Sequence, residues 1–345
     1  MYFASDNTAG IAPEILAALG AANTGYALGY GNDAWTQRVE RRFAEIFERE
    51  VAVFLVPTGT AANALAIAHL SPPWGAVLCH AESHIATDEC GAPEFFGGGL
   101  KLIGLKGEGA KVSATTLRAA LEGGQWGGPH HVSPGVLSLS QATECGTTYR
   151  VAETKELADI AHQHGMSVHM DGARLGNALA RMNVSPAEMT WKAGVDALSF
   201  GATKGGAMGA EAVIFFDVKR GAEMQSRRKR GGALASKHRF IAAQMDAFLD
   251  GDLWMRLARH ANAMADALAA GLTAAACKPV WPVEANEVFA PITTEMDKRL
   301  KAAGAMYYPW PAQGVRQDRI LVRLVTSFQT TNEDVEKFLA IVRAN

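Results

Sequence analysis

The 345-residue chain has few cysteines, almost no net charge and no long apolar run. Its four cysteines lie far apart and form no CxxC pair, which is typical of reduced thiols in a cytoplasmic protein rather than of a disulfide scaffold. The 33 basic and 35 acidic residues leave a net charge of −2, which argues against general binding to nucleic acid or to a membrane surface. We therefore expect neither of these partners.

Membrane and targeting signals are also missing. No stretch reaches the roughly eighteen consecutive apolar residues that predict a membrane span. The first residues, MYFASDNTAG, lack the basic and apolar regions of a signal peptide. The sequence therefore predicts a cytoplasmic protein, and it contains no motif that predicts a metal site.

The main pattern is an alternation of short apolar runs with segments of helical period. Residues 51–56, 195–200 and 212–216 are predicted strands, and residues 59–70 and 152–165 are predicted helices. Strands that alternate with helices indicate an α/β fold with a mainly parallel sheet covered on both faces. In such sheets, ligands bind beyond the carboxyl ends of the strands.

The pattern changes after about residue 236. A long stretch of helix-forming residues predicts one or two long helices, followed by a β-like run at 319–328 and a closing helix at 332–344. We predict a large domain over residues 1–240 and a small α+β domain over residues 241–345. The N-terminal segment is expected to contact the small domain or a neighbouring subunit.

One motif that follows a predicted strand suits a phosphate group. In PTGTAAN, residues 57–63, Gly59 lets the backbone approach an anion, and the hydroxyls of Thr58 and Thr60 lie beside the first N–H groups of a helix. The alternative interpretation is an ordinary helix cap by threonine.

Two further motifs follow strands later in the chain. Asp171 comes directly after the apolar run MSVHM, and it could keep the ring nitrogen of a cofactor protonated or simply pair with the nearby Arg174. Lys204 follows another strand among several glycines, where a lysine amine can form a Schiff base. The alternative for Lys204 is a solvated side chain at the tip of a hairpin.

Taken together, the three motifs predict a pyridoxal 5′-phosphate site. Asp171 and Lys204 are separated by about one βαβ crossover, which places them on nearby strands. A phosphate cradle, an acid for the pyridine nitrogen and a Schiff-base lysine are the contacts that this cofactor needs.

The motifs SDN, YGND, PTGTAAN, HMDGARLGNA, SFGATKGG and VRLVTSF, in this order, resemble the threonine aldolase family. The stretches ESHIATDECGAPEFF and SLSQATECGTTYR are similar to its bacterial low-specificity L-threonine aldolase and phenylserine aldolase branch. The resemblance implies a fold-type I enzyme with a large domain like that of aspartate aminotransferase. It also implies cleavage of L-threonine, L-allo-threonine or L-phenylserine to glycine and an aldehyde.

The resemblance assigns roles to individual residues. The implied cofactor contacts are Thr58, Gly59, Thr60, His84, Asp171, Arg174, Thr203, Lys204, Lys229 and Lys237. The implied substrate contacts are Ser5, Tyr30, Arg174 and Arg323. Among these, Lys204 is the Schiff-base lysine, Asp171 contacts the pyridine nitrogen, and His84 stacks on the ring first and acts as a base second. Arg174 and Arg323 are expected to bind the α-carboxylate, because a guanidinium fork suits a carboxylate.

The resemblance also implies a homodimer or homotetramer with shared active sites. Lys229 and Lys237 lie in a basic stretch, residues 219–239, and are expected to reach the cofactor phosphate of a neighbouring subunit. Most of this stretch is otherwise predicted to be a solvated helix face, because it is short and lacks the interleaved aromatics of a nucleic-acid site.

One position departs from the pattern of the family. Several relatives carry a histidine near the substrate hydroxyl in the loop that corresponds to QATECGTTY, and here that position is Glu144. The general base is therefore left open between Glu144, His84 and a water molecule.

Two other functions remain possible at this stage. The first is a pyridoxal-phosphate-dependent lyase that eliminates or deaminates amino acids like serine and threonine. The second is a catalytically silent binding protein with the same fold. A nucleotide-binding function is disfavoured because the chain has neither the GxGxxG motif nor the P-loop lysine.

Overall fold

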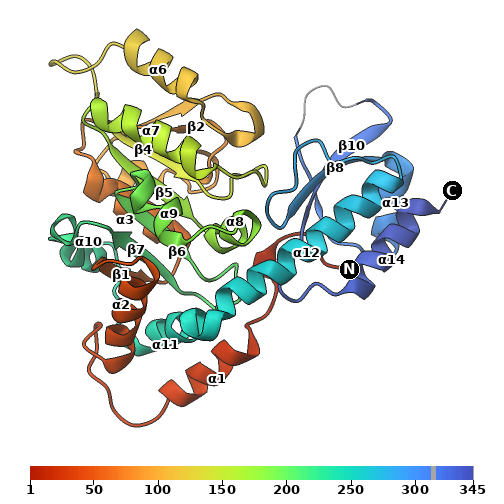
Figure 1. The fold of residues 1–345 in the computed structure, drawn as a ribbon, viewed down its shortest axis with the longest axis horizontal. Helices are drawn as coiled ribbons and strands as arrows, with labels where there is room; N and C mark the ends of the chain where they lie inside the picture. Colours follow the sequence, from red (N-terminus) through yellow and green to blue (C-terminus); the bar gives the residue numbers. More distant parts are fainter. Residues whose placement is uncertain (312–315, 345) are drawn as a thin grey trace.

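The computed structural model describes residues 1–311 and 316–344, and its main feature is a seven-stranded sheet (Figure 1). The order across the sheet is β1-β7-β6-β5-β4-β2-β3. The strands are β1 (Ala52–Val56), β2 (Gly75–His80), β3 (Lys101–Leu105), β4 (Ser133–Ser140), β5 (Ser167–Gly172), β6 (Ala197–Gly201) and β7 (Glu211–Phe215). All of these strands except β7 run in the same direction, so the predicted α/β fold with a mainly parallel sheet is confirmed.

The direction of β7 follows from the length of its connection. Residues 202–210 join β6 to β7, which is too short for the crossover of about a dozen or more residues that a parallel pair needs. The two strands therefore form an antiparallel pair, and Lys204 lies in the connection between them. Since β1 pairs with β7 in turn, β1 runs parallel to β6 and ends at the same edge of the sheet.

Helices cover both faces of the sheet (Figure 1). The longer helices of this part are α1 (Pro13–Ala22), α2 (Ala34–Ile46), α3 (Gly59–Leu70), α6 (Ala114–Gly123), α7 (Val151–Gln163), α8 (Leu175–Met182) and α11 (Arg239–Leu249). The shorter helices are α4 (His84–Thr87), α5 (Ala92–Phe96), α9 (Pro186–Met189) and α10 (Met224–Arg230). Helix α3 packs on one face against Val213 and Phe215, whereas α2, α7 and α11 cover the other face. This burial on both faces explains why the strands are continuous apolar runs.

A second, antiparallel sheet of three strands lies beside the first in the order β8-β10-β9 (Figure 1). Its strands are β8 (Glu287–Thr293), β9 (Tyr308–Pro309) and β10 (Arg319–Val325), and its helices are α13 (Thr294–Ala302) and α14 (Asn332–Arg343). The N-terminal segment joins this part, because Tyr2 bridges to Met306 and Phe3 is fully buried in the same core.

Helix α12 (Leu253–Ala274) runs from the large sheet to the small one (Figure 1). Trp254 at its start packs into the core of the large sheet, and Leu272 near its end packs into the core of the small sheet. The long helical stretch in the sequence is thus two helices, α11 and α12. The domain boundary at residue 240 stays a prediction. Among the described residues, no helix is both long and apolar enough to cross a membrane.

Candidate active site

A cavity of about 660 Å³ lies where the carboxyl ends of the parallel strands face the small sheet. Residues from both sheets and from the N-terminal segment line it. Those that the sequence had predicted are Ser5, Gly59, His84, Glu144, Asp171, Arg174, Lys204 and Arg323. Those that the sequence had not predicted include Asn63, Glu89, Ser140, Glu287, Tyr308 and Trp310.

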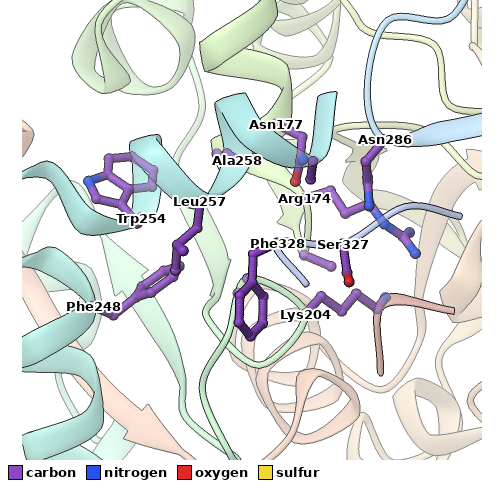
Figure 2. A pocket seen from close by; sticks show the side chains of 15 residues that line it. Arg174, Asn177, Lys204, Phe248, Trp254, Leu257, Ala258, Asn286, Ser327 and Phe328 are labelled. Carbon is purple, nitrogen blue, oxygen red and sulfur yellow. The ribbon is translucent and has the colours of Figure 1, made fainter. Parts of the chain in front are cut away.

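Lys204 is half-buried in the connection between β6 and β7. The connection approaches the end of β5 closely, since a Cβ on Gly201 would lie only 2.7 Å from Cα of Ala173. A narrow space of about 20 Å³, room for about one water molecule, lies behind Lys204. Figure 2 shows the apolar side chains of Phe248 and Trp254 on one side of Lys204 and polar side chains on the other. Lys204 thus stands between an apolar wall and the larger cavity.

A buried acid that the sequence did not reveal lies beneath this connection. Oε1 of Glu211, at the start of β7, accepts a hydrogen bond of 3.3 Å from the backbone N–H of Thr203. Burial raises the pKa of the Glu211 carboxyl to about 7. Thr203 also accepts a hydrogen bond at its hydroxyl from the N–H of Ala210, at 3.3 Å, so its side chain braces the turn.

Asp171 is buried at the end of β5 with both oxygens hydrogen-bonded. Its Oδ2 accepts a bond of 2.8 Å from Nδ2 of Asn63 on α3, and its Oδ1 accepts one of 3.0 Å from the N–H of Ala173. The pairing with Arg174 that we considered for this acid does not form. Arg174 instead donates two bonds to Asp6, from Nε at 2.8 Å and from Nη2 at 3.0 Å. Asp171 therefore forms no salt bridge with Arg174.

The two arginines predicted to bind the substrate carboxylate, Arg174 and Arg323, differ in whether acidic side chains already pair with them. Arg174 faces both Asp6 and Glu287, whose Oε2 lies 3.5 Å from Nη1 of Arg174. Within the described residues, Arg323 on β10 makes only one hydrogen bond, a long one of 3.4 Å to the carbonyl of Ala4, and its buried Nε has no partner. Arg323 is therefore the arginine with donors to spare for an incoming carboxylate.

An aromatic wall borders Arg323. The Arg323 guanidinium lies 5.2 Å from the ring centre of Trp310 and 6.0 Å from that of Tyr308, both of which line the cavity. Such contacts hold a guanidinium in place without using its N–H donors. Ser5 lies near this corner, and its hydroxyl accepts a bond of 3.1 Å from the N–H of Asn7.

Glu144 lies in the loop after β4 and is one of the residues that line the cavity. Its Oε1 accepts bonds from the backbone N–H of His84 at 2.8 Å and from the hydroxyl of Ser140 at 2.9 Å. Its Oε2 is buried and finds no hydrogen-bond partner in the described part of the chain. Burial raises the pKa of Glu144 to about 7. A carboxyl with such a pKa can both take up and release a proton near neutral pH.

His84 begins the short helix α4 and lines the same cavity. Its Nδ1 lies 2.8 Å from Oε1 of Glu89, whose side chain is fully buried. Glu89 follows His84 by five residues in the stretch ESHIATDE, but nothing in that spacing indicated that its side chain turns inward.

The remaining predicted residues lie elsewhere in this chain. Within residues 1–311 and 316–344, the cavity lining includes none of Thr58, Thr60, Tyr30, Thr203, Lys229 and Lys237. Thr58 caps α3, as its alternative interpretation required, by accepting a 3.1 Å bond from the N–H of Ala61. Lys229 and Tyr30 contact each other, with Nζ 4.9 Å from the ring centre. The cofactor and substrate roles of these residues stay predictions.

Comparison with known proteins decides the family. A sequence profile described as beta-eliminating lyase matches residues 2–295. The chain belongs to the β-eliminating lyase family. Within the family it is 39% identical over 343 residues to the low specificity L-threonine aldolase of Pseudomonas sp. strain NCIMB 10558, covering 99% of this chain and 97% of that one. It is 40% identical over 342 residues to the enzyme of the same name from Pseudomonas aeruginosa, covering 99% and 96%.

Solved structures agree with this fold. The threonine aldolase of Leishmania major matches with a TM-score of 0.93 and 28% identity over 99% of this chain and 98% of that one. The serine palmitoyltransferase of Sphingomonas wittichii matches with a TM-score of 0.73 and 15% identity over 99% and 86%, which shows a shared fold alone. The predicted resemblance to threonine aldolases and the predicted fold class are both confirmed.

Proposed function

We propose that this protein is a pyridoxal-phosphate-dependent aldehyde lyase that cleaves L-β-hydroxy-α-amino acids, such as L-threonine, to glycine and an aldehyde. One observation carries the proposal: Lys204, Asp171 and Arg323 line a single cavity in a chain that is about 40% identical to low specificity L-threonine aldolases over nearly its whole length. The substrate class is therefore a small amino acid with a hydroxyl on Cβ.

The cavity fits pyridoxal phosphate. Gly59 at the start of α3 lines it, and a Cβ there would meet no atom within 4 Å, so the N-terminus of α3 is open to a phosphate. The amine of Lys204 would hold the cofactor covalently, and the carboxylate of Asp171 would face the ring nitrogen. His84 would lie against the face of the ring. We assign these roles on the arrangement of the side chains around one cavity.

The chain's own residues would bind the substrate and move its proton. When bound, pyridoxal phosphate supplies an electron sink that accepts the electron pair of the broken Cα–Cβ bond. Arg323 would hold the α-carboxylate with its free donors. The carboxylate of Glu144 would accept the proton of the β-hydroxyl, whose oxygen becomes the carbonyl oxygen of the aldehyde. Glu144 suits this step better than His84 because burial brings the pKa of Glu144 to about 7, whereas the hydrogen bond to Glu89 raises the pKa of His84 and favours its protonated form, which cannot accept a proton.

A product assay tests the proposed function. Purified protein loaded with pyridoxal phosphate is given L-threonine and then L-phenylserine. We expect glycine with acetaldehyde in the first case and glycine with benzaldehyde in the second. A keto acid with ammonia would instead mean elimination or deamination, and no product from either amino acid, in protein that retains the cofactor, would favour a silent binding protein.

Replacing Glu144 with glutamine tests the assignment of the base. Because the ionised carboxylate accepts the proton and its pKa is about 7, we expect kcat/KM of the wild type to rise as the pH increases through 7. Glu144→Gln should lower kcat by about 10²-fold, the lower end of what a positioned base contributes, and should lose this rise.

Ser140→Ala is the matched control for the base. It keeps Glu144 but removes a hydrogen bond that lowers the Glu144 pKa, so the rise in kcat/KM should move to higher pH. A Glu144→Gln enzyme that keeps the rise near pH 7 would assign the base to another group.

We also propose a cytoplasmic homodimer or homotetramer in which Lys229 and Lys237 reach the phosphate site of a neighbouring subunit. Both lysines are exposed and neither lines the cavity of its own chain. The nearby loop exposes Tyr26 completely and Leu28 for 72% of its surface, which is unusual for large apolar side chains and typical of an interface. Sedimentation at the mass of one chain would contradict the assembly.

A further inference from the structure

Glu89 lines the cavity from the turn between α4 and α5, and its side chain is fully shielded from solvent. The backbone around it turns sharply, because Cys90 and Gly91 both have positive φ angles, 51° and 73°. This turn directs the side chain of Glu89 inward. A buried carboxylate is costly unless it is hydrogen-bonded, so its partners identify what it does.

Two donors from different elements meet at one oxygen of Glu89. Nδ1 of His84 and Nδ2 of Asn63 each lie 2.8 Å from Oε1 of Glu89. The same Nδ2 of Asn63 also donates to Oδ2 of Asp171 at 2.8 Å. One amide group thus uses both of its hydrogens to join Glu89 to Asp171.

The orientation of the Asn63 amide is fixed by chemistry. A flipped amide would point Oδ1 at two carboxylates, which cannot donate to it when ionised. In the observed orientation Oδ1 is buried and unpaired among the described residues. The unpaired acceptor is tolerated because the two bonds to carboxylates are charge-assisted and strong. The chain His84, Glu89, Asn63, Asp171 is therefore a single connected network.

Charged groups from four elements surround His84. Glu89 accepts from its ring, Glu144 accepts from its backbone N–H, and Asp171 and Lys204 lie near its ring. The hydrogen bond to Glu89 is the largest influence and raises the pKa of His84, Asp171 acts in the same direction, and burial and Lys204 oppose them. Removing the charge of Glu89 should therefore lower the pKa of His84 more than removing the charge of any other nearby acid.

We propose that Glu89 is a positioning residue of the active site: it accepts a hydrogen bond from Nδ1 of His84, fixes the orientation of this imidazole and leaves Nε2 facing the cavity. Asn63 fixes the Glu89 carboxylate for this purpose and ties it to Asp171. His84 would meet the face of the cofactor ring and Asp171 its nitrogen. One buried hydrogen-bond network thus holds both side chains in position. The catalytic meaning of this network rests on the proposed function.

Solid-state nitrogen NMR on full-length, cofactor-loaded protein with heavy nitrogen in its histidines tests the proposal. The method reports the protonation of each ring nitrogen, and a His84→Asn variant identifies the signal among the ten histidines. In the wild type, His84 should titrate above the ordinary histidine value, and its neutral form should keep the proton on Nδ1. Glu89→Gln should shift this titration downward.

Asp88→Asn is the matched control. Asp88 precedes Glu89 directly and also lines the cavity, but its side chain is exposed, makes no hydrogen bond to His84 among the described residues and accepts one of 2.8 Å from the hydroxyl of Thr87. Water screens its charge, so this variant should leave the His84 titration close to that of the wild type. An equal shift in both variants would mean that general charge rather than the Glu89 bond controls His84, and the proposal would be wrong.

The wild type alone can also overturn the proposal, even if Glu89→Gln fails to fold. A neutral His84 that carries its proton on Nε2 is incompatible with a bond from Nδ1 to Glu89. The NMR measurement requires no turnover, so it separates the two proposals. Expected spectra without aldol cleavage would refute the proposed reaction and leave the role of Glu89 intact. Normal aldol cleavage by a protein whose neutral His84 carries its proton on Nε2 would refute the role of Glu89 and support the proposed reaction.

Discussion

Replacing Lys204 with alanine is expected to abolish aldol cleavage almost completely. The amine of Lys204 is the only lysine nitrogen in the cavity lining among the described residues, so no other side chain there can hold pyridoxal phosphate covalently. We expect kcat to fall by roughly 10⁴-fold or more, the scale seen when a covalent catalytic group is removed. Initial rates of glycine formation at saturating cofactor measure this loss.

A chemical readout accompanies the rate. Reduction of the loaded wild type with borohydride, followed by peptide mass mapping, should place the cofactor on the peptide that contains Lys204. Lys204→Ala should carry no fixed cofactor, whereas Lys101→Ala, which removes an exposed lysine at the start of β3, should behave like the wild type. Near-normal cleavage by Lys204→Ala would refute the assignment of this lysine.

The order of the motifs along the chain was enough to predict the centre of the site. Asp171 lies at the end of β5 and Lys204 follows β6, and these two strands are neighbours in the sheet, as the length of one crossover suggested. Short apolar runs and their end points are local properties of the sequence, so they can be predicted without knowledge of how the chain packs. The hairpin considered for Lys204 is also present, but the lysine in it is half-buried and lines the cavity.

The supporting residues could not be predicted in the same way. Asn63 and Glu89 belong to α3 and to the turn after α4, and they meet Asp171 only after these elements pack together. Asp6 reaches Arg174 across a separation of 168 residues. No spacing rule links positions so far apart, because the contact depends on how the N-terminal segment docks beside the small sheet. The sequence therefore predicts that Arg174 binds the substrate carboxylate, but it does not predict that Arg174 is already paired with Asp6.

Asp171→Asn is expected to have the second-largest effect. The substitution keeps the size of the side chain and removes the charge that would face the ring nitrogen. Losing one preorganised electrostatic contact of this kind typically costs about 10²–10³-fold in kcat. The KM should change little, because the substrate carboxylate would bind Arg323, which lies on β10 in the other sheet. Steady-state kinetics with L-threonine separate the two parameters.

The comparison of kcat with KM is what makes Asp171→Asn informative. A merely structural role for this buried acid would lower the amount of folded protein and the cofactor content, and would leave kcat per bound cofactor unchanged. An electrostatic role would lower kcat per bound cofactor and leave the fold intact. Asp159→Asn, which alters an exposed acid paired with Lys155 on α7, should change neither quantity. An Asp171→Asn enzyme with wild-type kcat per bound cofactor would show that the reaction does not depend on a carboxylate at this position.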